Sequence, residues 1–252
     1  MKTFSMTDTG IWRTMNQDYF FTSDTPVGNL PNLFIVSDGM GGHKAGEYAS
    51  RYTVERVVAS SSRNTSKNPV KILREAIEKA NEILVMEAGS DESKQGMGTT
   101  IVAATIEKGK MCVANVGDSR LYVVGDTIRQ ITKDHSYVAE MVRRGEVDPK
   151  DASMHPDKNI ITRAVGAGRD VHADAFEFPL SKKSRILMCS DGLSNMVEDA
   201  QLSQLLRSGK TPEKIGRKLI ETANKNGGKD NIAVIVIDCS CRETFNSNSG
   251  EV

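Results

Sequence analysis

Two acidic residues follow apolar runs inside the same tripeptide, Ser-Asp-Gly. Asp38 comes after the run 33–36, and Asp191 comes after the run 186–189. A third, Asp230, stands just before the apolar run 232–237. Strands that end or begin at carboxylates can bring those groups to one edge of a sheet, and Mg²⁺ and Mn²⁺ prefer oxygen ligands of this kind. The sequence therefore predicts a site for divalent cations.

Asp-Gly pairs and clustered glycines also occur in hairpin turns and in phosphate-binding loops, and the neighbouring residues distinguish these alternatives. An Asp-Gly pair usually marks a hairpin turn, but helical patterns follow both Gly39 and Gly192. Asp118 lies between two strand-like runs, so a turn and a metal ligand both stay open there. Residues 39–47 miss the last glycine of a dinucleotide fingerprint and the lysine of a phosphate loop. We assign these glycines to close backbone approach to a bound ion.

The chemistry predicted for such a site is attack on phosphorus. A bridging carboxylate holds two cations about 3.5–4 Å apart, and water between them is acidified toward neutral pH. A phosphate also needs a cationic partner. Arg13 is the candidate because a guanidinium binds two phosphate oxygens at once; a solvated arginine is the alternative. Asp18, five residues further on, is a candidate carboxylate behind the ligands.

Apolar spacing and turn residues predict the elements that position these groups. Short links between strand-like runs predict antiparallel neighbours, and strands flanked by helix pairs predict the α+β class. The stretch 145–174 has no strong period. The expected helices cover residues 44–60, from 68 to about 84, 137–144, 200–206 and 212–223, and the expected strands cover 33–36, 100–106, 111–116, 121–124, 127–131, 185–190 and 231–238.

Composition excludes several classes of protein. The 252 residues contain 33 Lys+Arg and 33 Asp+Glu, whereas nucleic-acid-binding proteins usually show a basic excess. The apolar runs are far shorter than the ~20 residues that cross a bilayer, and no secretory signal is visible. We therefore expect a cytoplasmic protein without nucleic-acid or membrane partners. Its four cysteines are expected to be free thiols, because Cys239 and Cys241 lack further zinc ligands at fixed spacings.

Taken in order, the motifs resemble the metal-dependent serine/threonine protein phosphatases, the PPM or type 2C family, in the bacterial form. The resemblance implies one PPM-type domain over residues 1–240, a flap at about 145–174 and a polar tail at 241–252. It also implies a four-layer αββα sandwich of two antiparallel sheets flanked by helix pairs. The matching segments are 10–18, 36–50, 96–100, 116–121, 134–136, 161–166, 189–192 and 228–232.

The same resemblance implies the activity and the ion ligands. Phosphoserine and phosphothreonine on proteins would be hydrolysed when a metal-bridging water or hydroxide attacks phosphorus. Asp38, Asp191 and Asp230 would hold one Mn²⁺ or Mg²⁺ ion, and Asp38 with the Gly39 carbonyl would hold the second. Asp118, together with Asp191, would bind a weaker third ion.

Further roles are implied for residues around the ions. Arg13 would bind the phosphate, and Asp18 would orient metal-bound water. Two positions depart from the pattern, because many relatives have His where this chain has Met40 and Glu where it has Gln17. His43 is not assumed to replace the missing histidine. The implied partners are phosphoproteins, namely a bacterial serine/threonine kinase and its substrates, with the phosphatase acting as a monomer.

Two other functions are compatible with a carboxylate cluster. A two-metal phosphodiesterase or nuclease would use the same ligands, but the neutral charge balance speaks against it. A catalytically dead phosphoprotein-binding module would be expected to lose metal carboxylates, and this chain keeps each of them.

Overall fold

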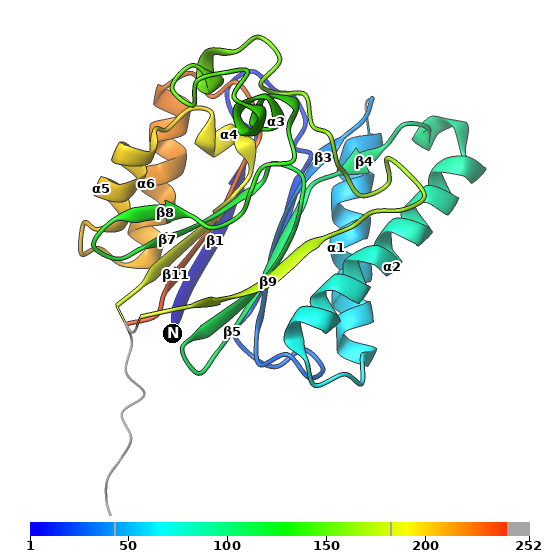
Figure 1. Ribbon diagram of the computed structural model, residues 1–252, viewed down its shortest axis with the longest axis horizontal. Coiled ribbons are helices and arrows are strands. Elements are labelled where there is room, and N and C mark those ends of the chain that lie inside the picture. The colour runs from blue at the N-terminus through cyan, green and yellow to red at the C-terminus, as the bar shows by residue number, and fades with distance from the viewer. Residues whose placement is uncertain (43, 182, 241–252) are drawn as a thin grey trace, which may run out of the picture.

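The computed structural model describes residues 1–42, 44–181 and 183–240 (Figure 1). His43 and the expected tail at 241–252 lie outside the described residues, and a domain boundary at 240 stays a prediction. In chain order the elements are β1 (Lys2–Asp8), β2 (Asp18–Ser23), β3 (Leu33–Met40), α1 (Ala45–Arg63), α2 (Pro69–Ser90), η1 (Glu92–Lys94), β4 (Gly98–Thr99), β5 (Ile101–Glu107), β6 (Lys110–Val116), β7 (Arg120–Val124), β8 (Ile128–Gln130), α3 (Tyr137–Arg144), η2 (Ala152–Met154), β9 (Asp174–Pro179), β10 (Arg185–Cys189), α4 (Asp191–Ser194), α5 (Asp199–Leu206), α6 (Pro212–Lys225) and β11 (Ile232–Asp238).

Two antiparallel sheets form the centre of the molecule. The first, here called the β11 sheet, has the strand order β1-β11-β10-β7-β8; the second, the β3 sheet, has the order β2-β3-β5-β6-β9, with β4 added to β3. Helices α1 and α2 pack on the outer face of the β3 sheet, and α5 and α6 pack on the outer face of the β11 sheet (Figure 1). The predicted α+β class and four-layer sandwich are confirmed.

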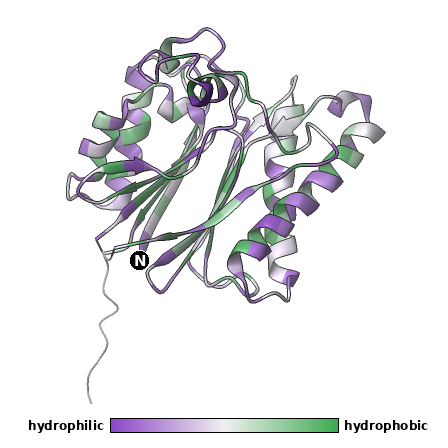
Figure 2. Ribbon diagram, viewed as in Figure 1, coloured by the Kyte–Doolittle hydropathy of each residue, from purple (hydrophilic) through white to green (hydrophobic). Residues whose placement is uncertain are grey.

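Strict alternation along the strands explains the layers. In β3, Leu33 and Ile35 face the core under α1 and α2, whereas Phe34 and Val36 face the core between the sheets. Strand β11 alternates in the same way between the helix-covered core and the central core. Successive side chains of a strand point to opposite faces, so a continuous apolar run supplies two cores at once. Figure 2 shows these hydrophobic strands between helices that are hydrophilic on their outer surfaces.

Caps fix where the two main predicted helices begin. The Asn68 side chain accepts a hydrogen bond from the Lys71 N–H, and Pro69 opens α2. Thr211 caps α6 in the same way. A polar side chain at the cap satisfies an amide that has no partner within the helix, and proline at the first turn lacks that amide. Both starts agree with the prediction from the sequence.

One predicted pairing is wrong. Strand-like runs joined by short links were expected to pair as neighbours, but β6 belongs to the β3 sheet and β7 to the β11 sheet. The chain crosses between the sheets at residues 117–119, where Gly117 has φ +99° and its hydrogen faces Thr100. A hairpin at Gly117 is therefore excluded, and the crossing places Asp118 where the two sheets meet.

Strands β1, β2 and β9 were not predicted. In β1, Phe4 and Met6 alternate with Thr3, Ser5 and Thr7, a period of two that polar composition obscured. The flap region has little regular structure beyond η2 and two isolated bridges, and its expected last residue, Asp174, is the first residue of β9. Among the described residues, no helix is long and apolar enough to span a membrane.

Candidate active site

Asp38 is held rigidly in β3. It lies opposite Asp18 in the β2–β3 register. Its N–H donates to the Thr100 hydroxyl, and its carbonyl accepts from the Thr100 N–H and the Thr99 hydroxyl, at 2.7 to 3.0 Å. The neighbouring Ser37 hydroxyl lies 2.7 Å from the Thr100 carbonyl. Every backbone polar group of Asp38 is thus used, and only its carboxylate is left to face the cavity.

Asp191 begins α4 directly after β10. The preceding Ser190 hydroxyl donates to Asp18 Oδ2 at 2.6 Å and accepts from the Ala233 N–H at 2.9 Å. Asn195, one turn on, donates to Asp191 Oδ2 at 3.0 Å. In both Ser-Asp-Gly tripeptides the serine therefore ties the aspartate to a neighbouring strand.

Asp230 and Asn231 anchor the segment that carries Arg13. The Arg13 guanidinium donates to Asp230 Oδ2 at 2.8 Å. Buried Asn231 was not singled out by the sequence, because a lone polar residue before a strand has no periodic signal. Its side chain accepts from one backbone N–H and donates to two carbonyls of the 9–17 segment, at 2.8 to 2.9 Å, those of Gln17, Thr9 and Met15.

Asp118 lies in the segment that crosses between the sheets. His135 fixes this segment through two hydrogen bonds to Gly117, the residue before Asp118. The Gly117 N–H donates to His135 Nδ1 at 3.1 Å, and the His135 N–H donates to the Gly117 carbonyl at 3.0 Å. Nδ1 must therefore be unprotonated, which leaves the ring proton on Nε2 for Asp174, 3.1 Å away. His135 therefore has a structural role, in which it fixes the crossing segment through hydrogen bonds.

The structure brings six of the seven predicted residues around one cavity of about 310 Å³. Asp18 is the exception, since it lies buried behind the cavity against Ser190. The six predicted residues that line the cavity are Arg13, Asp38, Gly39, Asp118, Asp191 and Asp230. Met40 and Gln17, the two departures from the family pattern, line it as well.

Crowded carboxylates dominate the electrostatics of this cavity. Burial raises the pKa of Asp18 to about 8, and the charges of Asp191 and Asp230 add to the rise. Burial and the neighbouring carboxylates, Asp18 first, raise the pKa of Asp38 well above its usual range. Burial raises the pKa of Asp118 to about 8, with Asp191 contributing. Such groups cannot all ionise without compensating positive charge.

The donor set fits divalent cations. Asp18 Oδ1 and Asp191 Oδ1 are buried and make no hydrogen bond within the described part of the chain, and such orphaned oxygens need a proton, water or an ion. Across residues 1–42, 44–181 and 183–240, no three His, Cys, Asp or Glu side chains already form a complete ligand set. Arg13 and Asn195 hold two of the carboxylates, so side-chain rotation must accompany ion binding.

The raised pKa of Asp118 predicts a pH-dependent stability difference. In the unfolded chain this carboxyl titrates near its ordinary 3.8, whereas in the fold it keeps its proton to about pH 8. Asp118 therefore lowers the free energy of unfolding by an amount that grows as pH rises from 4 to 8. With chelator present, Asp118→Asn should match the wild type near pH 4 and exceed its free energy of unfolding at pH 8 by at least about 1 kcal/mol. Urea titrations across this range measure the difference; a gap independent of pH would contradict it.

The glycines of the two tripeptides lie against the backbone of other segments. A Cβ on Gly39 would lie 2.0 Å from the Gly46 carbonyl oxygen and 2.8 Å from that of Gln17, and one on Gly192 would lie 1.9 Å from the Asn231 carbonyl oxygen. These glycines therefore allow backbone segments to pack together. The close approach of residues 39–47 to a bound ion stays a prediction.

Comparison with known proteins agrees with this geometry. The family model Protein phosphatase 2C matches residues 13–235. The serine/threonine phosphatase stp of Listeria monocytogenes is 39% identical over 241 residues, 92% of this chain and 93% of that protein. The structure of serine/threonine phosphatase Stp1 from Staphylococcus aureus covers 94% of each chain, at 35% identity and a TM-score of 0.88.

A further similar structure contains metal. It is the catalytic domain of the serine/threonine protein phosphatase PstP in complex with 2 manganese ions, which matches at 28% identity with a TM-score of 0.82, covering 94% of this chain and 97% of that one. The match of the family model, the identity to the relatives and the shared fold lead to one conclusion: this chain belongs to the protein phosphatase 2C family.

Proposed function

We propose that this chain removes phosphate from phosphoserine and phosphothreonine on proteins, with Asp38, Asp191 and Asp230 as the central metal ligands. It is a metal-dependent serine/threonine protein phosphatase that acts on phosphoproteins. The observation that supports the ligand assignment is that carboxylates from three separate strand ends line one cavity at the meeting edge of two sheets.

We assign the ions as follows. Asp38, Asp191 and Asp230 hold one Mn²⁺ or Mg²⁺; Asp38 and the Gly39 carbonyl hold a second; Asp118 and Asp191 hold a weaker third. When bound, such cations supply Lewis acidity that activates water and neutralises charge on phosphate oxygens. All assigned ligands are oxygens, as these hard cations require. The crowded carboxylates, whose pKa values are raised without a cation, support this assignment.

The chain's own residues bind and orient the substrate. We assign Arg13 to the phosphate oxygens: its side chain is half-exposed at the cavity mouth, and Asp230 is its only ion-pair partner within the described residues. Asp18 accepts from Ser190 through one oxygen, and its other oxygen is buried behind the cavity with no hydrogen-bond partner among the described residues; we assign this oxygen to orienting metal-bound water. Met40 cannot donate a proton, so we assign protonation of the leaving alkoxide to water.

The cellular role follows from the same class of substrate. We propose that a serine/threonine kinase and the proteins it phosphorylates are the partners, and that one copy of the chain suffices, because every assigned ligand comes from a single chain. The cytoplasmic location expected from the sequence stays a prediction.

Phosphate release from a phosphothreonine peptide tests the proposal. We expect release that requires manganese, stops with excess chelator and returns when manganese is restored. A calorimetric titration of Mn²⁺ into the wild type and Asp118→Ala should show loss of the weakest site alone in the variant. Release that is unaffected by chelator would contradict the function, and an empty site in Asp118→Ala would contradict the division of ligands.

A further inference from the structure

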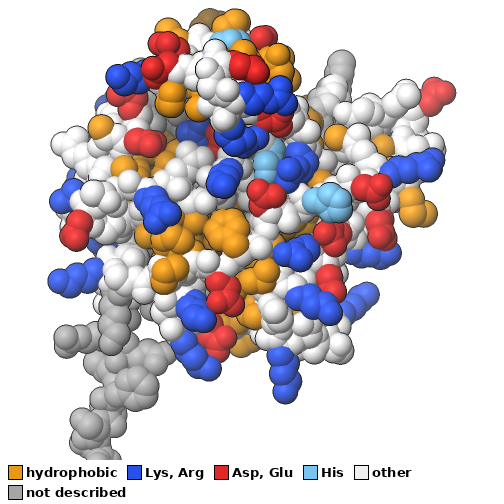
Figure 3. All heavy atoms as spheres, viewed as in Figure 1, with side chains coloured by type: hydrophobic (Ala, Val, Ile, Leu, Met, Phe, Trp, Pro, Cys, Tyr) orange, Lys and Arg blue, Asp and Glu red, His pale blue; other side chains and the backbone are white. Residues whose placement is uncertain are grey.

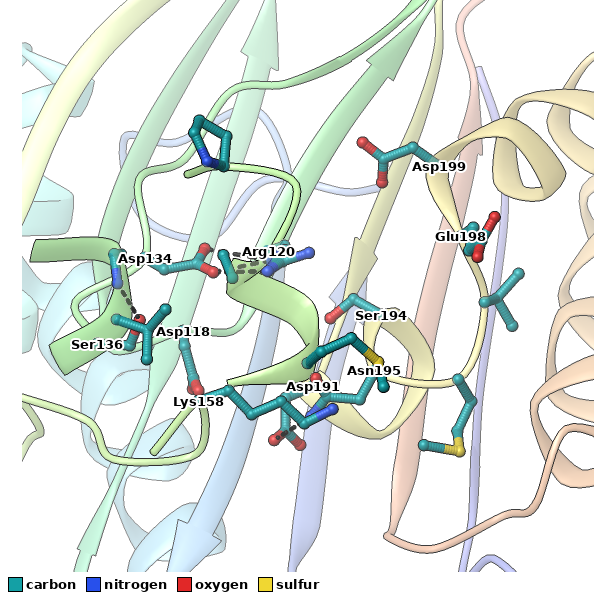
Figure 4. A pocket seen from close by; sticks show the side chains of 17 residues that line it. Asp118, Arg120, Asp134, Ser136, Lys158, Asp191, Ser194, Asn195, Glu198 and Asp199 are labelled. Atoms are coloured by element: carbon teal, nitrogen blue, oxygen red, sulfur yellow. Dashed lines mark hydrogen bonds and ion pairs between the residues drawn. The ribbon is translucent and has the colours of Figure 1, made fainter. Parts of the chain in front are cut away.

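A second cavity of about 560 Å³ adjoins the candidate active site (Figure 4). It lies between the flap, α3 and the segment that joins α4 to α5. The two cavities share Asp118 and Asp191 as wall residues. A group that enters the second cavity therefore lies beside the cavity assigned to the phosphate, at a position that a neighbouring residue of the same peptide can reach.

Much of the wall is apolar. The α3 and flap side and the α4–α5 side each contribute aliphatic or thioether side chains, which suits the methylene stem of a long side chain. Two hydrogen bonds join the middle of the flap to the start of α3: the Tyr137 N–H donates to the Ile160 carbonyl at 2.7 Å, and the Thr162 N–H donates to the His135 carbonyl at 2.8 Å. The apolar wall residues are Val138, Ala139, Pro149, Ala152, Met154, Met196 and Val197.

Some charged side chains of this cavity form ion pairs and others do not. Arg120 and Asp134 neutralise each other, with Nη2 and Oδ2 2.7 Å apart. Glu198 and Asp199, on the opposite side in Figure 4, are exposed and form no ion pair within the part of the chain described here. Glu198 occupies the N-cap position of α5, yet its side chain accepts no capping hydrogen bond. Its carboxylate is therefore not used by the helix.

We propose that this cavity binds an arginine or lysine side chain of the phosphoprotein, a few residues from the phosphorylated serine or threonine. The stem packs on the apolar wall, and the cationic head pairs with Glu198 and Asp199. The inference rests on the proposed function, which it extends to a class of substrate sequence. The preference is local, because the chain carries no net formal charge and Figure 3 shows acidic and basic side chains interspersed over the visible face.

Lys158 of the flap also lines the cavity and has no ion-pair partner within the described residues. It repels a basic ligand and so limits the preference. Removing it, as in Lys158→Gln, should increase selectivity for a basic residue, whereas removing the two acids should abolish that selectivity. Opposite effects from charges in one cavity are not expected of a merely structural role.

Pairs of phosphothreonine peptides that differ by arginine or alanine at a single position provide the test. Positions up to about four residues on either side are scanned, a reach set by the extended chain. For the wild type with manganese we expect kcat/KM to be about three- to fivefold higher with arginine at one or more positions, the size typical of an exposed ion pair. In the double variant Glu198→Gln, Asp199→Asn this ratio should fall to about one, and added salt should lower it in the wild type.

The ratio of two peptides within each variant cancels any general loss of activity. Glu213→Gln is the matched control, since Glu213 also lies in the first turn of a helix but outside this cavity, and its ratio should equal that of the wild type. A wild-type ratio near one at every position, or a ratio that persists in the double variant, would overturn the inference while the proposed function stands. No manganese-dependent release from any peptide would overturn both.

Discussion

Asp38→Asn is expected to lower manganese-dependent phosphate release by roughly 1000-fold or more, because the variant loses the carboxylate assigned to bridge two ions. The fold should be retained. Asparagine has nearly the same shape, and the pKa of Asp38 is raised by burial and by its acidic neighbours, so the ion-free fold favours an uncharged group at this position. Steady-state assays with a phosphothreonine peptide measure the loss, and circular dichroism checks the fold.

Asp126→Asn is the matched control for this experiment. Asp126 lies exposed in the link between β7 and β8, away from the candidate active site. It should keep wild-type activity and wild-type manganese affinity. Activity of Asp38→Asn within tenfold of the wild type would mean that Asp38 is not a bridging ligand.

Gly192→Ala is expected to destabilise the protein by about 3 kcal/mol, the upper range for overpacking. The added Cβ would lie 1.9 Å from the Asn231 carbonyl oxygen, a backbone atom that cannot move alone. Alanine would otherwise favour the helix α4 by up to about 1 kcal/mol, so a loss of stability isolates the steric effect. Displacing Asn231 also shifts Asp230 and the 9–17 segment, and activity should fall with stability.

Urea unfolding with chelator present measures this cost without any contribution from bound metal. Gly125→Ala is the control, because a Cβ at Gly125 meets no atom within 4 Å, and its free energy of unfolding should differ little from that of the wild type. Equal stability of the Gly192 and Gly125 variants would show that the backbone adjusts freely at Asn231, contrary to the close packing described above.

Much of the fold could be predicted because its signals are local. Apolar runs identified the central strands, and caps at Asn68 and Thr211 located two helix starts. Strand β1 was missed because its composition is polar, whereas the wrong pairing has a long-range cause. Whether the segment after β6 turns back or crosses to the other sheet depends on where Thr100 lies against Gly117, a contact that no spacing reveals.

In the candidate site, too, some residues could be predicted from local sequence and others could not. Residue type and position at strand ends pointed to Asp38, Asp191 and Asp230, which face one cavity. Asn231 and Ser190 were overlooked as determinants because each acts through hydrogen bonds to segments distant in sequence. The strongly raised pKa of Asp18 comes first from burial and then from the charges of Asp191 and Asp230, and both the burial and the proximity are properties of the fold.

The ligands that we propose come from both sheets: Asp38 and Gly39 belong to the β3 sheet, whereas Asp191 and Asp230 flank strands of the β11 sheet. Cations bound there would cross-link the sandwich at one end, across the central apolar layer. Resistance to proteolysis should therefore depend on divalent cations as catalysis does. With the proposed ligands, a cell that becomes starved of the divalent cation would lose the enzyme by degradation as well as by inactivation.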